Sequence, residues 1–495
     1  MAAIFSNFLT RNVAPKGADE ALLRAITLPD NEAQDAFLAF EREADFENLP
    51  WSSYRLLSLL SRRIATIAPN SLLRPRITGI ERAVWVRSRV AVSEAVPLLR
   101  LFKNAGIPLM LIKGAGWATW SLPVLQGRLI NDIDVCVPPD RMEEAFDLAV
   151  ANGWEPSGAG SALFHRARLD RATGINLVKG RFGNIDLHRT MFHGLYQRSV
   201  GDAELWKRSI TTQFEGVAVQ VPHPVDAVTI ALAHGAGEAH ANLDWIIDLC
   251  GAMSLGLDWS LLETTIARRN LRAMAALTFD FLKKSLHQPV PEQVCAHGAE
   301  WIANHPIKAL LDVAEVPARK GTSFLFKIAR PIKKQIRLRH RRQNRKSSML
   351  KFQASVVPNK IGVPVDANAL GFSQCFELPV AEPNASSNGQ FSVRLQMVCP
   401  DKPRKIYLEL NTESRHLLRI RAYGRGELEV HFQVPVSCDA GDRRLYLVSC
   451  PAQRFNKGDP RADESSHGAI PFRVIDANFP ILPQRSEAEA SRAQD

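Results

Sequence analysis

The sequence predicts an α+β fold in which helices flank a small sheet, followed by a separate all-β sandwich. Apolar residues recur at helical spacing over residues 18–68, 81–102 and 224–287. Between the last two of these stretches lie short apolar runs bounded by Gly and Pro, which is the pattern of buried strands. After about residue 370, short alternating runs separated by turn residues follow one another, as is typical of a β-sandwich.

The individual elements follow from these patterns. In the first part, whose sheet core is predicted at about 105–222, we expect a helix at 142–152 and strands at 107–112, 129–137, 162–169, 175–179 and 184–188. In the sandwich we expect strands at 391–398, 405–410, 417–422, 427–434 and 444–448. The predicted domains are 1–320 with helical segments at both ends, a basic linker at 321–360, the sandwich at 361–480 and a disordered tail at 481–495.

Composition excludes several classes of protein. The 46% of hydrophobic and 23% of charged residues are an ordinary globular balance, which excludes a largely disordered chain. No apolar run approaches the roughly 18–20 residues of a membrane-spanning helix, and the first residues lack the pattern of a secretory leader. Seven cysteines without a CxxC pair favour reduced thiols over a disulfide framework or a zinc site. We therefore expect a cytoplasmic protein.

The positive charge is concentrated in one short segment. Residues 327–346, here called the basic arm, hold ten Lys and Arg and no acid, so the net charge of +11 leaves about +1 for the rest of the chain. We interpret the arm as a helix or linker. Three roles stay open for it: a solvated linker, attachment to anionic lipid at the inner membrane surface, and nucleic-acid binding, which the lack of interleaved aromatic residues disfavours.

Two aspartates stand in the predicted strand 129–137. Side chains alternate along a strand, so Asp132 and Asp134 project from the same face, with Ile133 on the other. Two carboxylates held this close repel each other unless a cation or a proton shares the site, and a hard divalent ion such as Mg²⁺ prefers oxygen ligands. The alternative is a strand end whose acids only face water.

Residues before and after this strand extend the pattern. Lys113 and Gly114 end the preceding strand and open a helix, a geometry that presents backbone N–H groups to phosphate. Asp186 lies on a later apolar strand, and His188 shares its face. Arg128, just ahead of the aspartate strand, is suited either to a phosphate or to a structural ion pair.

The order of these motifs resembles the polymerase-β-like nucleotidyltransferases, and in particular a bacterial family called uncharacterised nucleotidyltransferases. The similarity covers roughly residues 20–290 and includes the helical segments 231–234 and 243–249; its motifs are Leu-Ile-Lys-Gly-Ala at 111–115, Gly-Arg at 127–128, Asn-Asp-Ile-Asp at 131–134 and Ile-Asp-Leu-His at 185–188. The resemblance implies transfer of a nucleoside monophosphate from a nucleoside triphosphate (NTP) to an acceptor that the sequence does not identify. The cofactor that it implies is Mg²⁺ or Mn²⁺.

The same resemblance assigns roles to single residues. Asp132 and Asp134 would hold the metal that carries the triphosphate, and Asp186 a second metal beside the acceptor hydroxyl; these three are the expected catalytic residues. The expected nucleotide- and phosphate-binding residues are Lys113, Gly114, Arg128 and His188. One departure from the pattern is Ala115, because many active members of the superfamily have serine after this glycine.

Two alternatives to an active enzyme stay open. The first is a degenerate nucleotide-binding or regulatory protein that keeps the acids but does not turn over. The second is a scaffold of a polysaccharide or envelope system, because the C-terminal part resembles accessory domains of bacterial glycosyltransferases at 370–372, 417–426, 443–448, 459–463 and 471–474. That resemblance implies a glycan or protein partner. The absence of Walker and protein-kinase motifs disfavours ATPase or kinase chemistry.

Overall fold

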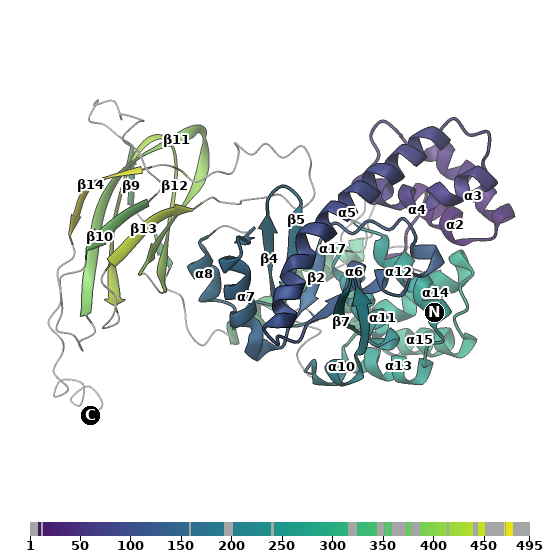
Figure 1. The fold of residues 1–495 in the computed structure, drawn as a ribbon. Coiled ribbons are helices and arrows are strands. Elements are labelled where there is room, and N and C mark those ends of the chain that lie inside the picture. The colour runs from purple at the N-terminus through teal and green to yellow at the C-terminus, as the bar shows by residue number, and fades with distance from the viewer. Residues whose placement is uncertain are drawn as a thin grey trace. The chain divides into compact units, whose positions relative to one another are not determined.

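The chain forms two compact units in a computed structural model, shown in Figure 1. Unit 1 comprises Met1–Asn152 and Leu177–Asn344, and unit 2 comprises Gly153–Asn176 and Arg345–Asp495. The structure describes residues 8–10, 13–157, 160–192, 201–238, 242–314, 324–343, 351–353, 355–358, 373–377, 387–412, 415–438, 444–450, 470 and 472–478. The domain boundaries expected from the sequence stay predictions, and the tail at 481–495 lies outside the described residues.

Two groups of helices share one apolar core in unit 1. The helices before the sheet are α2 (Ala18–Thr27), α3 (Asp30–Glu43), α4 (Trp51–Ile67) and α5 (Arg74–Asn104). Those after it are α11 (Pro224–Glu238), α12 (Asp244–Ala252), α13 (Trp259–Arg268), α14 (Arg272–Leu286), α15 (Glu292–Asn304) and α16 (Pro306–Val313), with the short turn η3 (Met253–Leu255). Fully buried residues of both groups pack in one cluster, for example Phe40, Leu57 and Ile246. The predicted helical stretches are confirmed.

The first sheet along the chain is mixed, and its strands β5, β2, β1, β7 and β6 belong to unit 1. Its strands are β1 (Met110–Ile112), β2 (Ile133–Cys136), β3 (Glu155–Pro156), β4 (Gly174–Lys179), β5 (Gly183–His188), β6 (Ile210–Phe214) and β7 (Val217–Val221), in the order β3-β4-β5-β2-β1-β7-β6. The strand β2 runs parallel to β5 and antiparallel to β1, whereas β1 runs parallel to β7. Between the strands lie α6 (Lys113–Ala118), η1 (Pro123–Leu125), η2 (Pro139–Arg141), α7 (Met142–Ala151), α8 (Ala162–Arg166) and α10 (Ala203–Arg208).

One predicted strand is wrong. Residues 162–169 begin with the helix α8, because the hydroxyl of Ser161 accepts a hydrogen bond from the backbone N–H of Phe164 at 3.1 Å and so caps a helix. The β6–β7 hairpin lies within the predicted sheet core but was not foreseen as a pair of strands. Its turn holds Glu215 at a φ of 49° and Gly216 at 73°, so two consecutive left-handed residues reverse the chain.

Alternation along the strands places the site on one face of the sheet. Met110, Ile112 and Cys136 lie in one buried cluster. The same cluster contains Phe192, Leu205 of α10 and Ile230 of α11. Asp134 is two residues from Cys136 on β2, so its side chain belongs to the same face. The long helix α5 packs against β2, β5 and β7 and connects the sheet to the N-terminal helices (Figure 1).

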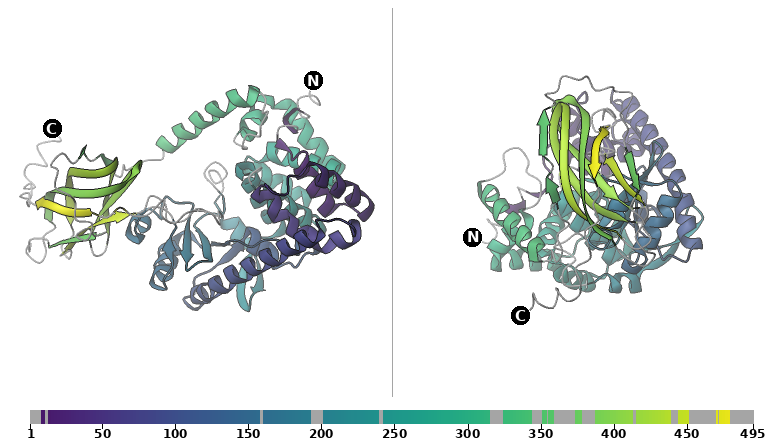
Figure 2. Two further views of the ribbon diagram at one scale, coloured as in Figure 1. Left: turned by 90° about the horizontal axis from the view of Figure 1, so that it is seen from above. Right: turned by 90° about the vertical axis from the view of Figure 1, so that its left-hand side faces the viewer.

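A long hairpin organises unit 2. Its strands β11 (Ser387–Asn411) and β12 (His416–Cys438) pair along most of their length, with a shift of register between Cys399 and Arg404, and they curve strongly (Figure 2). The other strands are β8 (Lys351–Gln353), β9 (Ser355–Pro358), β10 (Ser373–Glu377), β13 (Arg444–Cys450) and β14 (Phe472–Asn478). The strands β14 and β13 pair with opposite halves of β11. The predicted α+β fold with a C-terminal sandwich is confirmed.

A buried ion pair joins the segment Gly153–Asn176 to the strands of unit 2. Glu409 is fully buried; its Oε1 accepts a hydrogen bond from Arg419 Nη2 at 2.5 Å, and its Oε2 accepts one from the backbone N–H of Ser161 at 2.9 Å. The guanidinium of Arg419 also lies 3.4 Å from the centre of the Phe164 ring. A charged pair of this kind satisfies a buried carboxylate that would otherwise destabilise the unit.

The basic arm falls largely on a helix. The helix α17 (Phe324–Gln343) packs through Phe326 and Ala329, both buried, and Lys333 forms an ion pair with Asp312 of α16. The helical option for the arm is therefore confirmed as far as residue 343, and the residues beyond it lie outside the described part. None of the helices in the described part of the chain combines the length and the apolar character that crossing a bilayer requires.

Gly127→Ala should destabilise unit 1 more than a matched substitution. Gly127 has a φ of 92°, and a Cβ on it would lie 2.8 Å from the carbonyl oxygen of Ser58, whereas Gly106, with a φ of 65°, has nothing within 4 Å of the same position. We expect Gly106→Ala to lower the free energy of unfolding by about 1–2 kcal/mol through backbone strain. Gly127→Ala should cost about 1–3 kcal/mol more through the close contact. Denaturant titrations of both variants test this, and equal losses would contradict it.

Candidate active site

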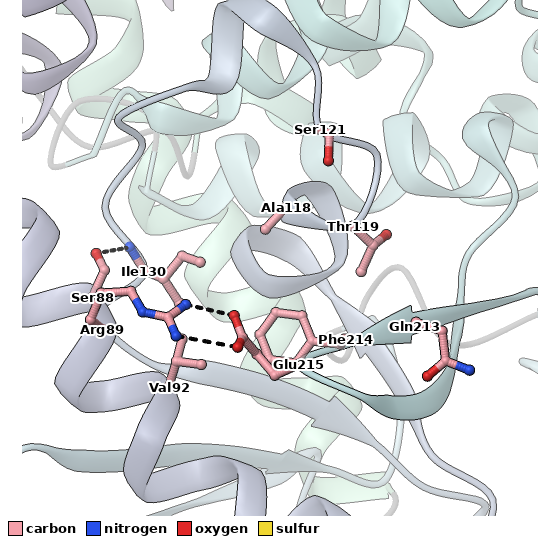
Figure 3. A pocket seen from close by; sticks show the side chains of 10 residues that line it. All are labelled: Ser88, Arg89, Val92, Ala118, Thr119, Ser121, Ile130, Gln213, Phe214 and Glu215. Atoms are coloured by element: carbon pink, nitrogen blue, oxygen red, sulfur yellow. Dashed lines mark hydrogen bonds and ion pairs between the residues drawn. The ribbon is translucent and has the colours of Figure 1, made fainter.

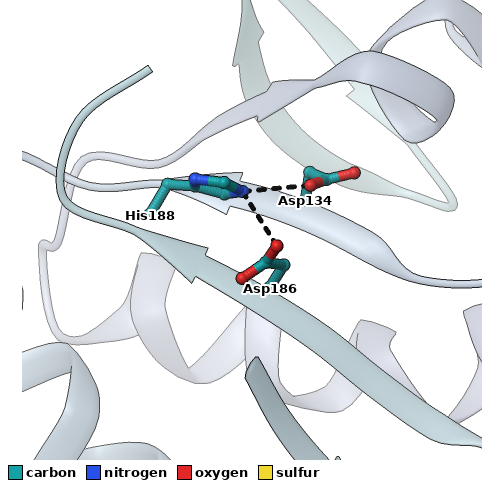
Figure 4. A group of neighbouring side chains, drawn as sticks. All are labelled: Asp134, Asp186 and His188. Atoms are coloured by element: carbon teal, nitrogen blue, oxygen red, sulfur yellow. Dashed lines mark hydrogen bonds and ion pairs between the residues drawn. The ribbon is translucent and has the colours of Figure 1, made fainter. Parts of the chain in front are cut away.

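Two carboxylates meet because two parallel strands are in register. The β2–β5 pairing sets Asp134 opposite Asp186 and Cys136 opposite His188. Residues opposite each other on neighbouring strands project from the same face, so the three polar side chains converge (Figure 4). Asp186 therefore lies on the same face of the sheet as Asp134.

His188 lies between the two carboxylates. Its Nε2 is 3.0 Å from Oδ1 of Asp134 and 3.3 Å from Oδ2 of Asp186. One ligand atom from each of the three side chains falls within 4.8 Å of the others, a spacing that a single metal ion can bridge. The sequence placed His188 on the same face as Asp186 but did not foresee that it contacts both acids.

Lys113 supplies a second positive group. Ile112 pairs with Asp134 across the antiparallel β1–β2 ladder, and the chain then turns directly into α6 with Lys113 at a φ of 50°. This left-handed backbone, costly for a residue with a Cβ, brings the ammonium group Nζ to 2.5 Å from Oδ1 of Asp134. The turn therefore falls on Lys113 rather than on the glycine that follows it.

The pKa values follow from this arrangement of charge. Burial alone would lower the pKa of His188, but Asp186 and the hydrogen bonds to both acids outweigh it and raise the pKa to about 9. Burial alone would raise the pKa of Asp134, but Lys113 and His188 lower it to about 2. The pKa of Lys113 is raised because Asp134 and Asp186 outweigh its burial. Without a metal, two cations therefore neutralise two anions.

Gly114 makes room for a buried arginine. A Cβ at Gly114 would lie 2.6 Å from Nη1 of Arg128, whose guanidinium forms two hydrogen bonds to Asp248 of α12, at 2.6 Å from Nε and 2.8 Å from Nη2. Burial raises the pKa of Asp248 to about 6 against the lowering effect of Arg128. The sequence left phosphate binding and a structural ion pair open for Arg128, and the structure shows the ion pair. Phosphate binding by Gly114 and Arg128 stays a prediction.

Asp132 stands apart from the three converging side chains. It comes one residue before β2, is half-buried, and does not belong to the group formed by Asp134, Asp186 and His188 in the described part of the chain. Its charge nevertheless acts on Lys113 and on Arg128 and favours the protonated form of both. Its role as a metal ligand stays a prediction.

The donor set fits a hard divalent ion. Carboxylate oxygens are the ligands that Mg²⁺ and Mn²⁺ prefer, whereas imidazole nitrogen suits later transition metals better. Asp134 and Asp186 would therefore hold such an ion, and Lys113 and His188 would then have to yield part of their contact with the carboxylates. In the metal-free site and in a metal-bound one alike, positive charge neutralises Asp134 and Asp186.

A separate cavity of about 310 Å³ opens between α5, the end of α6 and the β6–β7 turn (Figure 3). Arg89 and Glu215 form an ion pair across one side of it, with Nη1 of Arg89 2.6 Å from Oε1 of Glu215. The residues that line it are Ser88, Arg89, Val92, Ala118, Thr119, Ser121, Ile130, Gln213, Phe214 and Glu215. Asp134, Asp186 and His188 are not among the residues that line this cavity.

The segment that contains the site matches a known family of proteins. Residues 52–287, a little less than half of the chain, match the model of a family described as uncharacterised nucleotidyltransferases. The resemblance drawn from the motifs is thereby confirmed for this segment, which contains β1, β2 and β5. Over this segment the chain is similar to that family.

Two solved structures are similar to 37% of this chain. One is a crystal structure of ANT(2'')-Ia in complex with adenylyl-2''-tobramycin, with 16% identity, 97% of that chain covered and a TM-score of 0.27. The other is a solution structure of the antibiotic-resistance factor ANT(2'')-Ia, with 15% identity, 94% of that chain covered and a TM-score of 0.28. Likenesses of this size support no inference about this chain. No curated protein matches it.

The stability of the metal-free protein should fall as the pH rises through the folded-state pKa of His188. A pKa raised from its ordinary 6.5 to about 9 contributes stability that is fully present below pH 6.5 and lost by about pH 9. The shift corresponds to roughly 3 kcal/mol. Denaturation in EDTA at several pH values measures this loss, and His188→Gln should remove it.

An exposed histidine provides the control. His297 lies on the surface of α15, where its Nδ1 is 3.0 Å from Oε1 of Glu263, and because exposed pairs contribute little, His297→Gln should change the profile much less than His188→Gln does. If the His188→Gln variant shows the same loss between pH 6.5 and 9 as the wild type, the imidazole is not held as a cation by the two carboxylates.

Proposed function

We propose that unit 1 transfers a nucleoside monophosphate from an NTP to an acceptor in a reaction that depends on Mg²⁺ or Mn²⁺. The observation that carries this proposal is the register of β2 and β5, which sets Asp134 and Asp186 side by side within the family-matched segment. Reactions of this type need positioning and charge neutralisation more than covalent chemistry. A buried carboxylate and a half-buried one beside a lysine are suited to that task.

Each side chain has a distinct part in this proposal. Asp134 and Asp186 would hold the metal ion, which when bound would neutralise the charge that develops on the phosphate oxygens. Lys113 is a point charge next to Asp134 and would contact a phosphate oxygen of the bound nucleotide. His188, almost fully buried, fixes the orientation of both carboxylates through Nε2. Asp132 completes the ligand set from the residue just before β2.

A nucleotide-binding protein without turnover is the alternative. The observation that favours it is Ala115, which is fully buried in α6 and has no hydroxyl to offer where many active members of the superfamily have serine. Such a protein would bind Mg²⁺ and NTP together but release no pyrophosphate. Lys113 compensates for the missing hydroxyl in the active interpretation.

Asp134→Asn and Asp186→Asn should each abolish transfer. The wild type, incubated with Mg²⁺, each NTP labelled at the α-phosphate and a cell lysate as the source of acceptor, should release pyrophosphate and label an acceptor. Loss of one charged ligand should lower the rate by at least about 10²–10³-fold. Asp170→Asn, at an exposed position, is the control. Undiminished transfer by Asp134→Asn would exclude the proposed role, and binding without pyrophosphate release would select the alternative.

We also propose that α17 attaches the protein to an anionic lipid surface. Leu325, Ile328 and Ile332 follow one another at helical spacing and are 44%, 46% and 47% exposed, while Phe326 and Ala329 face the protein. The helix therefore presents an apolar stripe, and the basic arm begins within it. A helix that combines such a stripe with many Lys and Arg binds in the interfacial plane of a membrane.

Vesicle sedimentation tests this attachment. Wild-type protein should sediment with phosphatidylserine-containing vesicles at low salt and much less at 1 M salt, because screening shortens the Debye length to about 3 Å. The double substitution Ile328→Asp and Ile332→Asp should weaken binding about tenfold or more. Ile307→Asp, at a 75% exposed position on α16, should not. Equal binding to vesicles without phosphatidylserine would leave α17 an ordinary connector.

A further inference from the structure

Arg87 on α5 is a half-buried cation without a carboxylate in hydrogen-bonding contact among the described residues. Its Nε donates a hydrogen bond to Oδ1 of Asn131 at 2.8 Å, and its guanidinium carbon lies 5.4 Å from the centre of the Trp51 ring. Both of these partners are neutral. The planar ring and the amide fix the direction of the guanidinium but do not balance its charge.

A second arginine lies on the same side. Arg55 comes one turn after Trp51 on α4, so the two share a helix face. Arg55 donates through Nη2 to Asp244, but its buried Nε has no hydrogen-bond partner. Burial lowers the pKa of Arg87, and the nearby charge of Arg55 lowers it further; Asp132 and Tyr54 offset part of this. Holding two like charges together in this way costs free energy.

The position of this pair relates it to the candidate active site. Asn131, which holds Arg87, directly precedes Asp132, so the guanidinium stands at the Asp132 end of the site. Trp51, Tyr54, Arg55 and Arg87 are all partly exposed, so a ligand from solution can reach them. An anion bound there would balance the charge of Arg87 and use its remaining N–H groups, and it would offset the repulsion between Arg87 and Arg55.

We propose that Arg87, with Arg55 behind it, binds a phosphate group next to the carboxylates Asp132, Asp134 and Asp186. The proposal rests on the proposed function, since it adds a phosphate-recognition point contributed by α4 and α5 rather than by the sheet. A guanidinium presents parallel N–H donors that match two phosphate oxygens, and stacking on Trp51 holds that fork in one plane. The phosphate belongs either to the polyphosphate of the NTP or to the acceptor.

The test uses the full chain and two probes that do not depend on the base, magnesium pyrophosphate and inorganic phosphate. Calorimetric titrations compare the wild type with Arg87→Gln, Arg87→Lys and a control, Arg89→Gln. Arg89 lies two residues further along α5 and forms its ion pair with Glu215 at the separate cavity. Hydrogen bonds to charged groups predict that Arg87→Gln loses about 10- to 100-fold in affinity for the phosphate that it binds.

The pattern of losses identifies the source of the phosphate. If it is the polyphosphate of the NTP, Arg87→Gln weakens pyrophosphate binding and Arg89→Gln does not. If it is a phosphate of the acceptor, pyrophosphate binding is unchanged, but inorganic phosphate no longer binds to the pyrophosphate-loaded variant. Arg87→Lys should show a smaller loss of the same kind, because it keeps the charge and not the fork. If Arg87→Gln fails to fold, the Arg87→Lys variant provides the test instead.

The proposal is overturned if Arg87→Gln and Arg87→Lys bind both probes as the wild type does, or if Arg89→Gln weakens binding equally. Its failure is distinguishable from that of the proposed function. A protein that binds no NTP and releases no pyrophosphate, yet binds inorganic phosphate through Arg87, would disprove nucleotidyl transfer and retain the phosphate site.

Discussion

The structure of unit 1 depends on how two adjacent carboxylates, one buried and one half-buried, are neutralised. Two like charges about 4 Å apart repel by about 4 kcal/mol at the effective dielectric constant of a protein surface, and burial makes each charge more costly. Asp134 and Asp186 are held together by the register of their strands, so the chain must bring positive groups to them. Lys113 and His188 do so, and the left-handed backbone at Lys113 is the strain accepted for that contact.

Further ion pairs neutralise buried charges between the site and the surrounding helices. Arg128 reaches from the loop before β2 to Asp248 of α12, and Arg55 of α4 reaches Asp244 at the start of the same helix. Breaking a buried pair of this kind is costly because it leaves a charge without its partner. The helices before and after the sheet are therefore connected to the site by charge as well as by their common apolar core, and Gly114 is needed because Arg128 occupies the space of its Cβ.

The sequence predicts the elements of the site better than their contacts. Strand alternation places Asp134, Asp186 and His188 on faces, and the parallel register then makes them meet. No local pattern shows that Lys113 bonds to Asp134, because that contact depends on where β1 ends against β2. The ion pair of Arg128 with Asp248 was one of two open roles, because the sequence separation of 120 residues hides the partner.

For the fold as well, features set by neighbouring residues were predictable and features set by distant contacts were not. Helices with a regular apolar spacing were predicted correctly, whereas 162–169 was misjudged because the cap at Ser161 outweighs a short apolar run. Gly153–Asn176 groups with the sandwich strands, and the buried Glu409 contacts Ser161 of this segment across 248 residues of sequence. Distant pairings of this kind leave no periodic signal in the sequence.

The most direct measurement is the anomalous scattering of Mn²⁺ in crystals of the full chain grown with a non-hydrolysable NTP analogue. Our account predicts a manganese peak within bonding distance of carboxylate oxygens of both Asp134 and Asp186, with the triphosphate attached and Lys113 Nζ moved from Asp134 to a phosphate oxygen. Analogue and manganese bound elsewhere, with the Lys113–Asp134–His188 contacts unchanged, would contradict it.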